Sequence, residues 1–339
     1  MVGEIVYVAG NASVSSHASE VKPERRGREA TWPSHIPFKG WKDIFWRLVR
    51  EIGEDRVMLI AAGSAFYLLL ALFPALAAFV SLYGIVSDPT TVAAQIQFLT
   101  GLIPAGGLEI VNSQLTSLAM QPRDALSFGF LFSLALALWS ANNGIKTLFE
   151  ALNVAYEETE KRGFFKLHLV TFSFTISALL IGIVVFAAIG LVPAILALFP
   201  LGNLIDALIR ILRWPLLLVF VCCGIAVLYR YGPSRARAKW RWITWGGIFA
   251  TVAWFAMSIG FSYYLENFAN YNAVYGSLGA VVGFMMWAWL SMTIVLIGAE
   301  LNSEIEHQTR QDSTTGPEKP MGERGAYVAD TVGKAAEEL

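Results

Sequence analysis

The feature that most constrains the fold is a long uncharged stretch near the C-terminus, residues 267–299. A helix needs roughly 20 apolar residues to cross the hydrocarbon core of a bilayer, so this stretch is long enough to span a membrane. The segment 271–304 opens with polar and aromatic residues and reaches a carboxylate at Glu300. Small residues recur along it at spacings that let a second helix approach closely; they are Gly276, Gly279, Ala280 and Gly283. We expect a membrane-spanning helix with one packed face and polar groups at both ends.

The composition of the whole chain agrees with a membrane protein. Of its 339 residues, 55% are hydrophobic and 15% are charged, whereas a soluble domain carries about 25% charged residues. Several other uncharged stretches of spanning length precede the one near the C-terminus. The sequence therefore predicts an all-α fold, a polytopic membrane helix bundle, with the lipid bilayer as its first partner.

Six transmembrane helices are expected from the uncharged stretches and from the prolines, glycines and charges that end them. The first carries Pro74 near its centre, where a proline usually kinks a helix. The second ends near Asn142 and Asn143 and is expected to continue as an amphipathic extension to Tyr156. The spans are expected at residues 57–87, about 125–146, about 167–198, 213–229, about 242–265 and 271–304.

Other segments are expected to lie outside the spans. Residues 1–37 and 307–339 are polar and are expected to be disordered cytoplasmic tails, which leaves residues 38–306 as the membrane domain. Residues 41–56 place apolar side chains at spacings of three and four among basic ones. That pattern suits a helix on an anionic membrane surface and equally one that packs on neighbouring helices. Residues 90–120 are too polar to span and are expected to form two amphipathic surface helices.

The distribution of lysine and arginine orients the bundle. The N-terminal flank, residues 146–166 and residues 230–241 are basic, whereas residues 88–124 contain only one basic residue, Arg123, and residues 266–272 contain none. The turn at residues 199–213 is a mild exception, because it contains Arg210 and Arg213. Basic loops remain on the cytoplasmic side of a membrane. Six spans with both termini in the cytoplasm fit this distribution.

Short motifs are distributed along the chain. They are Ala65-Phe66-Tyr67 with Leu72-Phe73-Pro74, Ala151-Leu152-Asn153 with Tyr156, Tyr229-Arg230-Tyr231 with Pro233, Tyr275-Gly276-Ser277-Leu278-Gly279-Ala280, and Gly298-Ala299-Glu300-Leu301-Asn302. Together they resemble the YihY/BrkB family of bacterial inner-membrane proteins, over residues 38–306. The resemblance implies six helices and a multi-pass location in the bacterial inner membrane. The family's older labels, a virulence factor for serum resistance and a ribonuclease, supply no mechanism, and a link of some members to envelope lipid export is only a pointer.

Catalytic chemistry is not indicated by the sequence. Metal-dependent hydrolysis needs several ligands that converge on one ion, and the four histidines are scattered over the tails and span ends; they are His17, His35, His168 and His307. No phosphate-binding loop or nucleophile motif is present, and the basic residues only flank spans. We therefore expect no enzyme activity, no metal or other cofactor and no nucleic-acid partner.

Polar residues at membrane depth are costly, which makes them the candidates for function. Glu300 lies near the cytoplasmic end of its helix. A structural role, in capping or in pairing with a basic residue, and a functional role as a gate or a proton-linked carboxylate both remain open. Asn142 and Asn143 lie at a similar depth and are candidates to hydrogen-bond Glu300 or Asn302. These four residues form an expected polar cluster.

Three smaller groups complete the candidates. Tyr67 is expected to place a hydroxyl group inside the bundle, and Pro74 a helix kink. Together they suggest a transport pathway through the bundle. Asn153 and Tyr156 are expected chiefly to fix the extension of the second span. The residues that open the last span are expected either to line an outward-facing cavity or to anchor the helix at the membrane interface; they are Tyr271, Asn272, Tyr275 and Gly276.

Two functions remain open on this basis. A transporter or flippase for a lipid or amphipathic solute predicts a cavity that contains Tyr67, Asn142 and Glu300. Without an ATP-binding motif, such transport would be passive, ion-coupled or assisted by another protein. A non-transporting membrane scaffold, for envelope integrity or partner recruitment, predicts a tightly filled bundle and function that survives Glu300→Gln. The oligomeric state is open.

Overall fold

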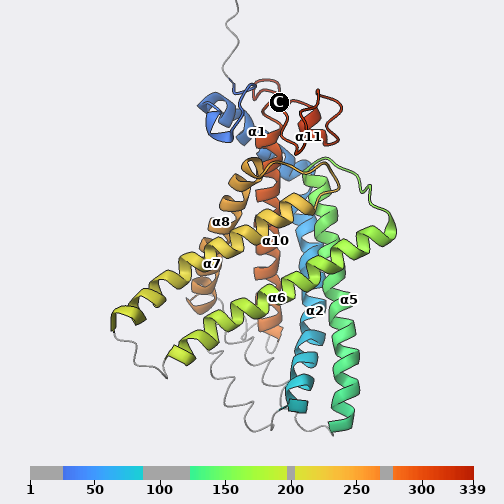
Figure 1. Ribbon diagram of the computed structural model, residues 1–339, viewed down its shortest axis with the longest axis vertical. Helices are drawn as coiled ribbons and strands as arrows, with labels where there is room; N and C mark the ends of the chain where they lie inside the picture. The colour runs from blue at the N-terminus through green and yellow to red at the C-terminus, as the bar shows by residue number, and fades with distance from the viewer. Residues whose placement is uncertain (1–25, 87–122, 197–202, 268–277) are drawn as a thin grey trace, which may run out of the picture.

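A computed structural model describes residues 26–86, 123–196, 203–267 and 278–339. The regular elements in these residues are helical, with one isolated β-bridge between Ala238 and Thr314. Six long helices form the body of the molecule (Figure 1); they are α2 (Val57–Val86), α5 (Arg123–Ala155), α6 (Phe164–Leu196), α7 (Asn203–Tyr231), α8 (Trp240–Asn267) and α10 (Gly279–Glu306). At one end lie the 3₁₀ turn η1 (Pro33–His35), α1 (Phe38–Glu54) and the short α11 (Tyr327–Asp330).

The long helices match the expected membrane bundle. By length and composition, five are able to cross a membrane, and they contain the apolar stretches Val57–Ala75, Phe128–Ala155, Phe164–Ile181, Trp240–Asn267 and Val281–Glu306. In the described part of α7 the apolar stretch is shorter, Pro215–Tyr231. The all-α membrane fold is therefore confirmed, with α7 at the place of the fourth expected span. The surface helices expected at 90–120 lie outside the described residues.

One boundary differs from its expectation. A turn was expected before residue 213, yet α7 already begins at Asn203. Asp206 and Arg210 interrupt the uncharged stretch but do not stop the helix, because neither residue breaks the backbone hydrogen-bond pattern. The length of an uncharged stretch indicates how many residues of a helix can lie in lipid. The helix itself can extend beyond that stretch, as α7 does.

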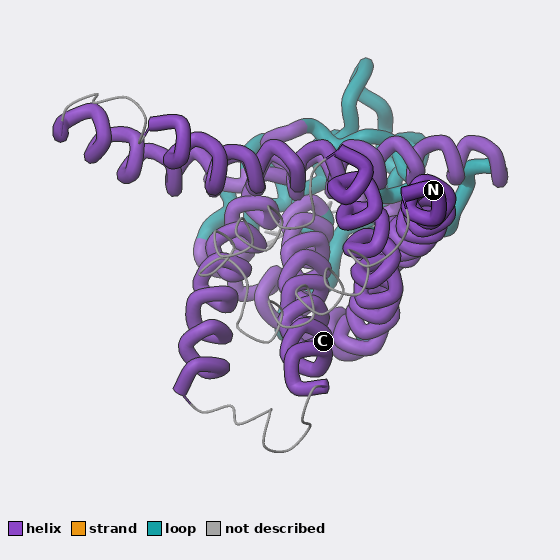
Figure 2. Tube along the Cα trace, turned by 90° about the horizontal axis from the view of Figure 1, so that it is seen from below, coloured by secondary structure: helices purple, strands orange, loops and turns teal. Residues whose placement is uncertain are grey.

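The six long helices divide into a central group and an oblique pair. In the central group α2 and α5 pack side by side, and α10 packs on α8, α2 and α5. The oblique pair is α6 and α7, which cross one side of the molecule and diverge from it at their far ends (Figures 1 and 2). The main packing partner of α6 is α5 and that of α7 is α8. We call α6 and α7 the arm.

Small residues allow the central helices to approach closely. Ala61, Ala151, Ala250 and Ala299 are all buried in the apolar core of this group. The tightest approach is between α8 and α10, where a Cβ atom added to Gly246 would collide with the Gly298 carbonyl oxygen. The small-residue face expected around Gly279 and Gly283 is looser, because a Cβ on Gly283 would lie 3.8 Å from Leu265, an ordinary contact.

The first helix, α1, buries an unusual face. It begins after Pro37, which can precede a helix because its missing N–H is not needed there, and it packs on α10 and α2. Its buried residues are Gly40, Asp43, Ile44 and Arg47, whereas the large apolar side chains of Phe45, Trp46 and Val49 are exposed. Of the two alternatives for this segment, packing on neighbouring helices is realised, and contact with a membrane surface stays a prediction.

The C-terminal segment corrects one expectation. Residues 307–339, expected to be a disordered tail, fold back over the end of the bundle and reach residues 26–30 and α1. Arg310 N donates to Arg28 O at 2.7 Å and Gln308 Nε2 donates to Arg26 O at 2.7 Å. Residues 26–37, also expected to be disordered, are part of this structure; residues 1–25 lie outside the described part of the chain.

Polar composition did not imply disorder here because the polar groups satisfy one another. Thr315 N donates to Arg237 O, and Lys239 N donates to Ser313 O, each at 2.8 Å. Asp330 accepts hydrogen bonds from the four backbone N–H groups of Gly322, Arg324, Gly325 and Ala326. Such bonds offset the cost of burying polar groups. We call the assembly formed by residues 26–56, 156–163, 232–239 and 307–339 the polar cap.

Candidate functional site

The most unusual polar group lies where α10 enters the polar cap. Glu300 is 2% exposed, and among the described residues no nitrogen or hydroxyl group donates to its Oε1 atom. Its carboxyl group is in hydrogen-bonding contact with Asp55, one of the two residues that connect α1 to α2. Arg56, the other connector residue, has φ 51°, and this left-handed conformation turns the chain sharply into α2. We call Asp55 and Glu300 the carboxyl pair.

Other acidic groups surround the carboxyl pair. Glu51 on α1 and Glu304 on α10 both act on the Glu300 carboxyl as like charges. Burial raises the pKa of Asp55 above its ordinary value, and Glu51 adds to the shift, whereas the hydrogen bond with Glu300 opposes it. Burial followed by the charge of Glu51 also raises the pKa of Glu157. The carboxyl pair therefore sits in a region that disfavours ionised carboxylates.

The neighbouring acid, Glu304, differs because it has a cation. Arg47 on α1 forms an ion pair with the Glu304 carboxylate, and both side chains are almost fully buried. The same guanidinium donates to Gln308 Oε1 and to the Lys334 carbonyl, each at 2.9 Å, and to the Glu304 carbonyl at 3.0 Å. A buried charge is tolerated when it is paired and hydrogen-bonded. Arg47 thus joins α1, α10 and the C-terminal segment.

A second buried ion pair lies two residues further along α10. Arg235, from the loop after α7, pairs with Glu306, which also accepts from the Ser313 hydroxyl at 2.7 Å. The Arg235 guanidinium lies 5.0 Å from the centroid of the Tyr156 ring. Tyr156 is buried next to Asn302 and its hydroxyl lacks a hydrogen bond of normal geometry within the described structure. This tyrosine therefore serves chiefly as packing beneath the arginine.

Asn302 fastens α10 to α8. Its Oδ1 accepts from Gly246 N at 2.7 Å and its Nδ2 donates to Ile243 O at 3.0 Å. Close by, the Tyr229 hydroxyl of α7 donates to the Val295 carbonyl at 2.6 Å. Interhelical bonds of this kind hold membrane helices in register. Asn302 is structural, and it gives a physical reason for the Gly298–Asn302 motif.

The expected polar cluster of Asn142, Asn143, Glu300 and Asn302 is not what the structure forms. Asn142 Oδ1 lies 3.5 Å from the hydroxyl of Thr175 on α6, and the Asn143 carbonyl accepts from Thr147 within α5. The Asn142 side chain thus faces α6, a packing partner of α5 that sequence spacing alone did not reveal.

The remaining candidates are also distributed over separate places. Tyr67 lies against Gly144 where α2 meets α5, and α2 continues as a helix through Pro74. Among the described residues, the three side chains of the expected cavity contact different neighbours: Tyr67 lies beside Gly144, Asn142 beside Thr175 and Glu300 beside Asp55. The four candidates at the start of the last span, Tyr271, Asn272, Tyr275 and Gly276, lie outside the described residues.

Asn153 joins the end of α5 to two neighbouring loops. Its Oδ1 accepts from Ser234 N at 2.7 Å, and its Nδ2 donates to Glu160 Oε2 at 3.0 Å. The residue therefore ties the end of α5 to the loops on either side of α6 and α7.

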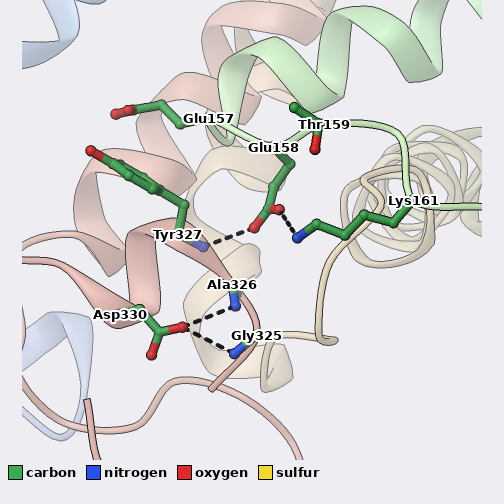
Figure 3. A pocket seen from close by; sticks show the side chains of 8 residues that line it. All are labelled: Glu157, Glu158, Thr159, Lys161, Gly325, Ala326, Tyr327 and Asp330. Carbon is green, nitrogen blue, oxygen red and sulfur yellow. Dashed lines mark hydrogen bonds and ion pairs between the residues drawn. The ribbon is translucent and has the colours of Figure 1, made fainter. Parts of the chain in front are cut away.

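An open cleft of about 310 Å³ lies in the polar cap, between the loop after α5 and the start of α11 (Figure 3). Glu158 accepts there from Tyr327 N at 2.8 Å and from Lys161 Nζ at 2.6 Å. Asp330 is held by backbone N–H groups, as Figure 3 shows for two of them. Because its carboxylates already have partners, we interpret this cleft as the seam along which the C-terminal segment docks.

The chemistry available to the candidate site is proton binding. Within the described ranges no three His, Cys, Asp or Glu side chains are grouped so that they could hold a metal ion. Two carboxyl groups in contact can instead share a proton. Sequence reasoning found Glu300 but missed Asp55, Arg47 and Glu304. The signal available was the spacing of Glu300 and Glu304, which places two acids on one helix face.

These features define a class: a polytopic α-helical membrane protein whose bundle is closed at one end by a polar cap. The chain belongs to the family described as Virulence factor BrkB, whose profile matches residues 48–322. It is 30% identical over 279 residues to the ribonuclease-like protein YfkH of Bacillus subtilis, covering 77% of this chain and 93% of the relative.

Other relatives carry names that state only a membrane protein. A UPF0761 membrane protein of Alteromonas mediterranea is 26% identical over 80% of this chain and 93% of its own length. One of Vibrio cholerae is 27% identical over 78% of this chain and 86% of its own length. The comparison with solved structures gave no match.

Proposed function

We propose that this membrane protein is a transporter or flippase that moves a lipid or an amphipathic solute, driven by an ion gradient or passively. Glu300 carries the proposal. It is an almost fully buried acid on a membrane-spanning helix, and it faces another acid instead of a cation. Ionisable groups at such positions are expensive, and in membrane proteins they mark substrate and ion pathways.

The arm supports an apolar or amphipathic substrate. Along α7, Leu216, Val219 and Phe220 are exposed, and along α6, Leu169 and Leu180 are exposed. Because each arm helix packs mainly on one central helix, lipid can reach both of its sides. A substrate that arrives through the bilayer would meet this surface first.

We further propose that the polar cap faces the cytoplasm of a bacterial inner membrane. The loops of the cap at 156–163 and 232–239 contain five lysine and arginine residues, whereas the connections at 87–122, 197–202 and 268–277 contain none, and Arg123, Arg210 and Arg213 lie in the helices that follow the first two of them. Basic segments remain on the cytoplasmic side. To test this orientation, single cysteines are placed at residues 163, 237 and 272 and labelled in intact cells with a reagent that does not cross the membrane. We expect labelling at residue 272 and none at residues 163 and 237.

The decisive test is reconstitution of the full chain into phosphatidylethanolamine–phosphatidylglycerol vesicles that contain a fluorescent phospholipid. A membrane-impermeant reductant then reports how fast the label moves between leaflets. We expect movement well above that in protein-free vesicles, and a loss of most of it in Glu300→Gln. Glu150→Gln, an exposed acid at the same end of the bundle, is the matched control. No movement above the protein-free rate would overturn the proposal.

A non-transporting scaffold is the second candidate, and a specific observation favours it. Tyr67, Asn142 and Glu300 have separate partners, and several candidate residues form interhelical fastenings instead of lining a pathway. A scaffold predicts that Glu300→Gln leaves cellular function intact and that vesicles show no lipid movement. Neither candidate is enzymatic; incubation of the purified protein with RNA tests the label that one relative carries, with no cleavage expected.

A further inference from the structure

We propose that the carboxyl pair, Asp55 and Glu300, binds one proton and that release of this proton separates the α1–α2 connector from α10. This inference rests on the proposed transport function, for which it names the coupling ion and its site. It assigns a functional role to Asp55, which no motif singled out. The two residues come from opposite ends of the membrane domain in sequence and meet only in the fold.

The need for a proton follows from the contact itself. Two ionised carboxylates have no donor to share and repel each other, so a hydrogen bond between carboxyl groups requires one bound proton. Glu300 has no other donor for Oε1 among the described residues and is 2% exposed. Water therefore cannot solvate a charge on Glu300, whereas Asp55 is partly exposed.

The groups around the pair strengthen this requirement. Glu51 and Glu54 of α1 face Asp55, and Glu304 of α10 faces Glu300. Two cations of α1 lie near these acids, and both already have partners: Arg47 pairs with Glu304, and Arg50 pairs with Glu51. From the end of α5, Tyr156 and Glu157 approach the same region, and neither carries a positive charge. The pair therefore has no cation of its own from α1, α5 or α10 in the described structure.

The position of the pair explains how a proton could act on the fold. Asp55 lies in a two-residue connector, directly before the helix that packs along α5, while α10 packs on α8. Loss of the shared proton would leave two adjacent carboxylates that repel each other, Glu300 buried and Asp55 partly exposed. Because Asp55 already lies partly in water, repulsion is relieved most easily when it moves outward and the α1–α2 connector leaves α10.

The experiment uses the full chain in lipid nanodiscs and reads the proton directly. Infrared difference spectra are recorded from about pH 5 to about pH 11, because a buried carboxyl group can titrate several pH units above its ordinary value. We expect a carboxylic-acid C=O band at neutral pH that shifts in D₂O, disappears as the pH rises, and is lost in Glu300→Gln and in Asp55→Asn. Glu150→Gln should keep the band.

A second readout separates this inference from the proposed function. In the vesicle assay, a pH gradient should change the rate of lipid movement in the wild-type protein and not in Asp55→Asn. If the band is absent from the wild-type protein, the proton site is overturned whether or not lipid moves. If the band is present but lipid movement ignores the gradient, the coupling is overturned. If no lipid moves at all, the proposed function fails, and the spectra still decide the proton site.

Discussion

The polar cap and the arm are built from helices of the same chain but are stabilised in opposite ways. In the cap, buried ion pairs such as Arg47–Glu304 and Arg235–Glu306 join segments far apart in sequence. In the arm, α6 and α7 each pack mainly on one neighbour and expose large apolar side chains. The cap depends on specific partners, whereas the arm depends on the bilayer. Substitutions should therefore be costly in the cap and almost neutral in the arm.

The largest effect is expected for Arg47→Met. The change leaves Glu304 buried without its cation and removes the bonds to Gln308 and the Lys334 carbonyl. Breaking one partner of a buried pair costs about 3–5 kcal/mol. Equilibrium unfolding in mixed micelles measures the loss.

Arg50→Met is the control for that substitution. Arg50 lies on the same helix, and its side chain is 36% exposed beside Glu51 and Glu54. Surface pairs contribute about 1 kcal/mol or less. Equal losses for Arg47→Met and Arg50→Met would contradict the comparison between buried and exposed pairs. The double variant Arg47→Met/Glu304→Gln should recover part of the lost stability.

Gly246→Ala should have the next largest effect. The new Cβ would meet the Gly298 carbonyl and the Asn302 side chain, so α8 and α10 would have to separate. Overpacking of this kind typically costs about 1–3 kcal/mol. Thermal unfolding of the purified protein in detergent measures it.

The matched control is on the same helix. Nothing lies within 4 Å of a Cβ added to Gly260, so Gly260→Ala should be neutral or stabilising by up to about 1 kcal/mol, because alanine favours the helix. A Gly246→Ala protein as stable as Gly260→Ala would show that the α8–α10 seam is looser than described.

A smaller effect on stability is expected when the pH is lowered and His307 binds a proton. Burial lowers its pKa to about 4, with Arg47 and Arg28 adding to the shift. In the unfolded chain the imidazole would bind a proton near pH 6.5. Docking of the C-terminal segment is therefore most stable above about pH 6.5 and weakens as the pH falls toward 4, by on the order of 1–3 kcal/mol.

Hydrogen exchange of residues 327–339 measures this docking, because Thr331 bonds to the His307 ring at 2.9 Å and Gly333 N donates to its carbonyl at 2.9 Å. We expect faster exchange at low pH, after correction for the intrinsic rate. In His307→Gln the pH dependence between about 6.5 and 4 should flatten. An unchanged slope would assign the effect to other groups.

The smallest effect is expected in the arm. Leu216 on α7 is 59% exposed, so Leu216→Ala should change the unfolding free energy by no more than about 0.5 kcal/mol. Leu296 on α10 is 2% exposed, and Leu296→Ala should cost about 2–5 kcal/mol. Similar costs for the two leucines would mean that a partner covers the arm.

Much of the helical frame could be predicted from the sequence, and little of the candidate site. Helix positions followed from uncharged stretches, because the bilayer sets a required length. Glu300 was recognisable as an acid beside an uncharged stretch. Its partner Asp55 was not, because 245 positions separate the two residues and no local periodicity connects them. The same holds for Arg47, because the pattern of residues 41–56 left open whether that helix lies on a membrane surface or packs on neighbouring helices.

The sequence by itself determined that this chain is an all-α membrane protein, where most of its long helices lie, and which family it belongs to. Hydropathy and motif content are properties of single segments, so they can be read without neighbours. Only the tertiary structure decided that Asn142 faces α6, that Asn302 fastens α8, that the C-terminal segment folds over the bundle, and that Glu300 meets another acid. Each of these contacts is set by which helix faces pack together in the fold. That packing decides which partner a buried polar group finds.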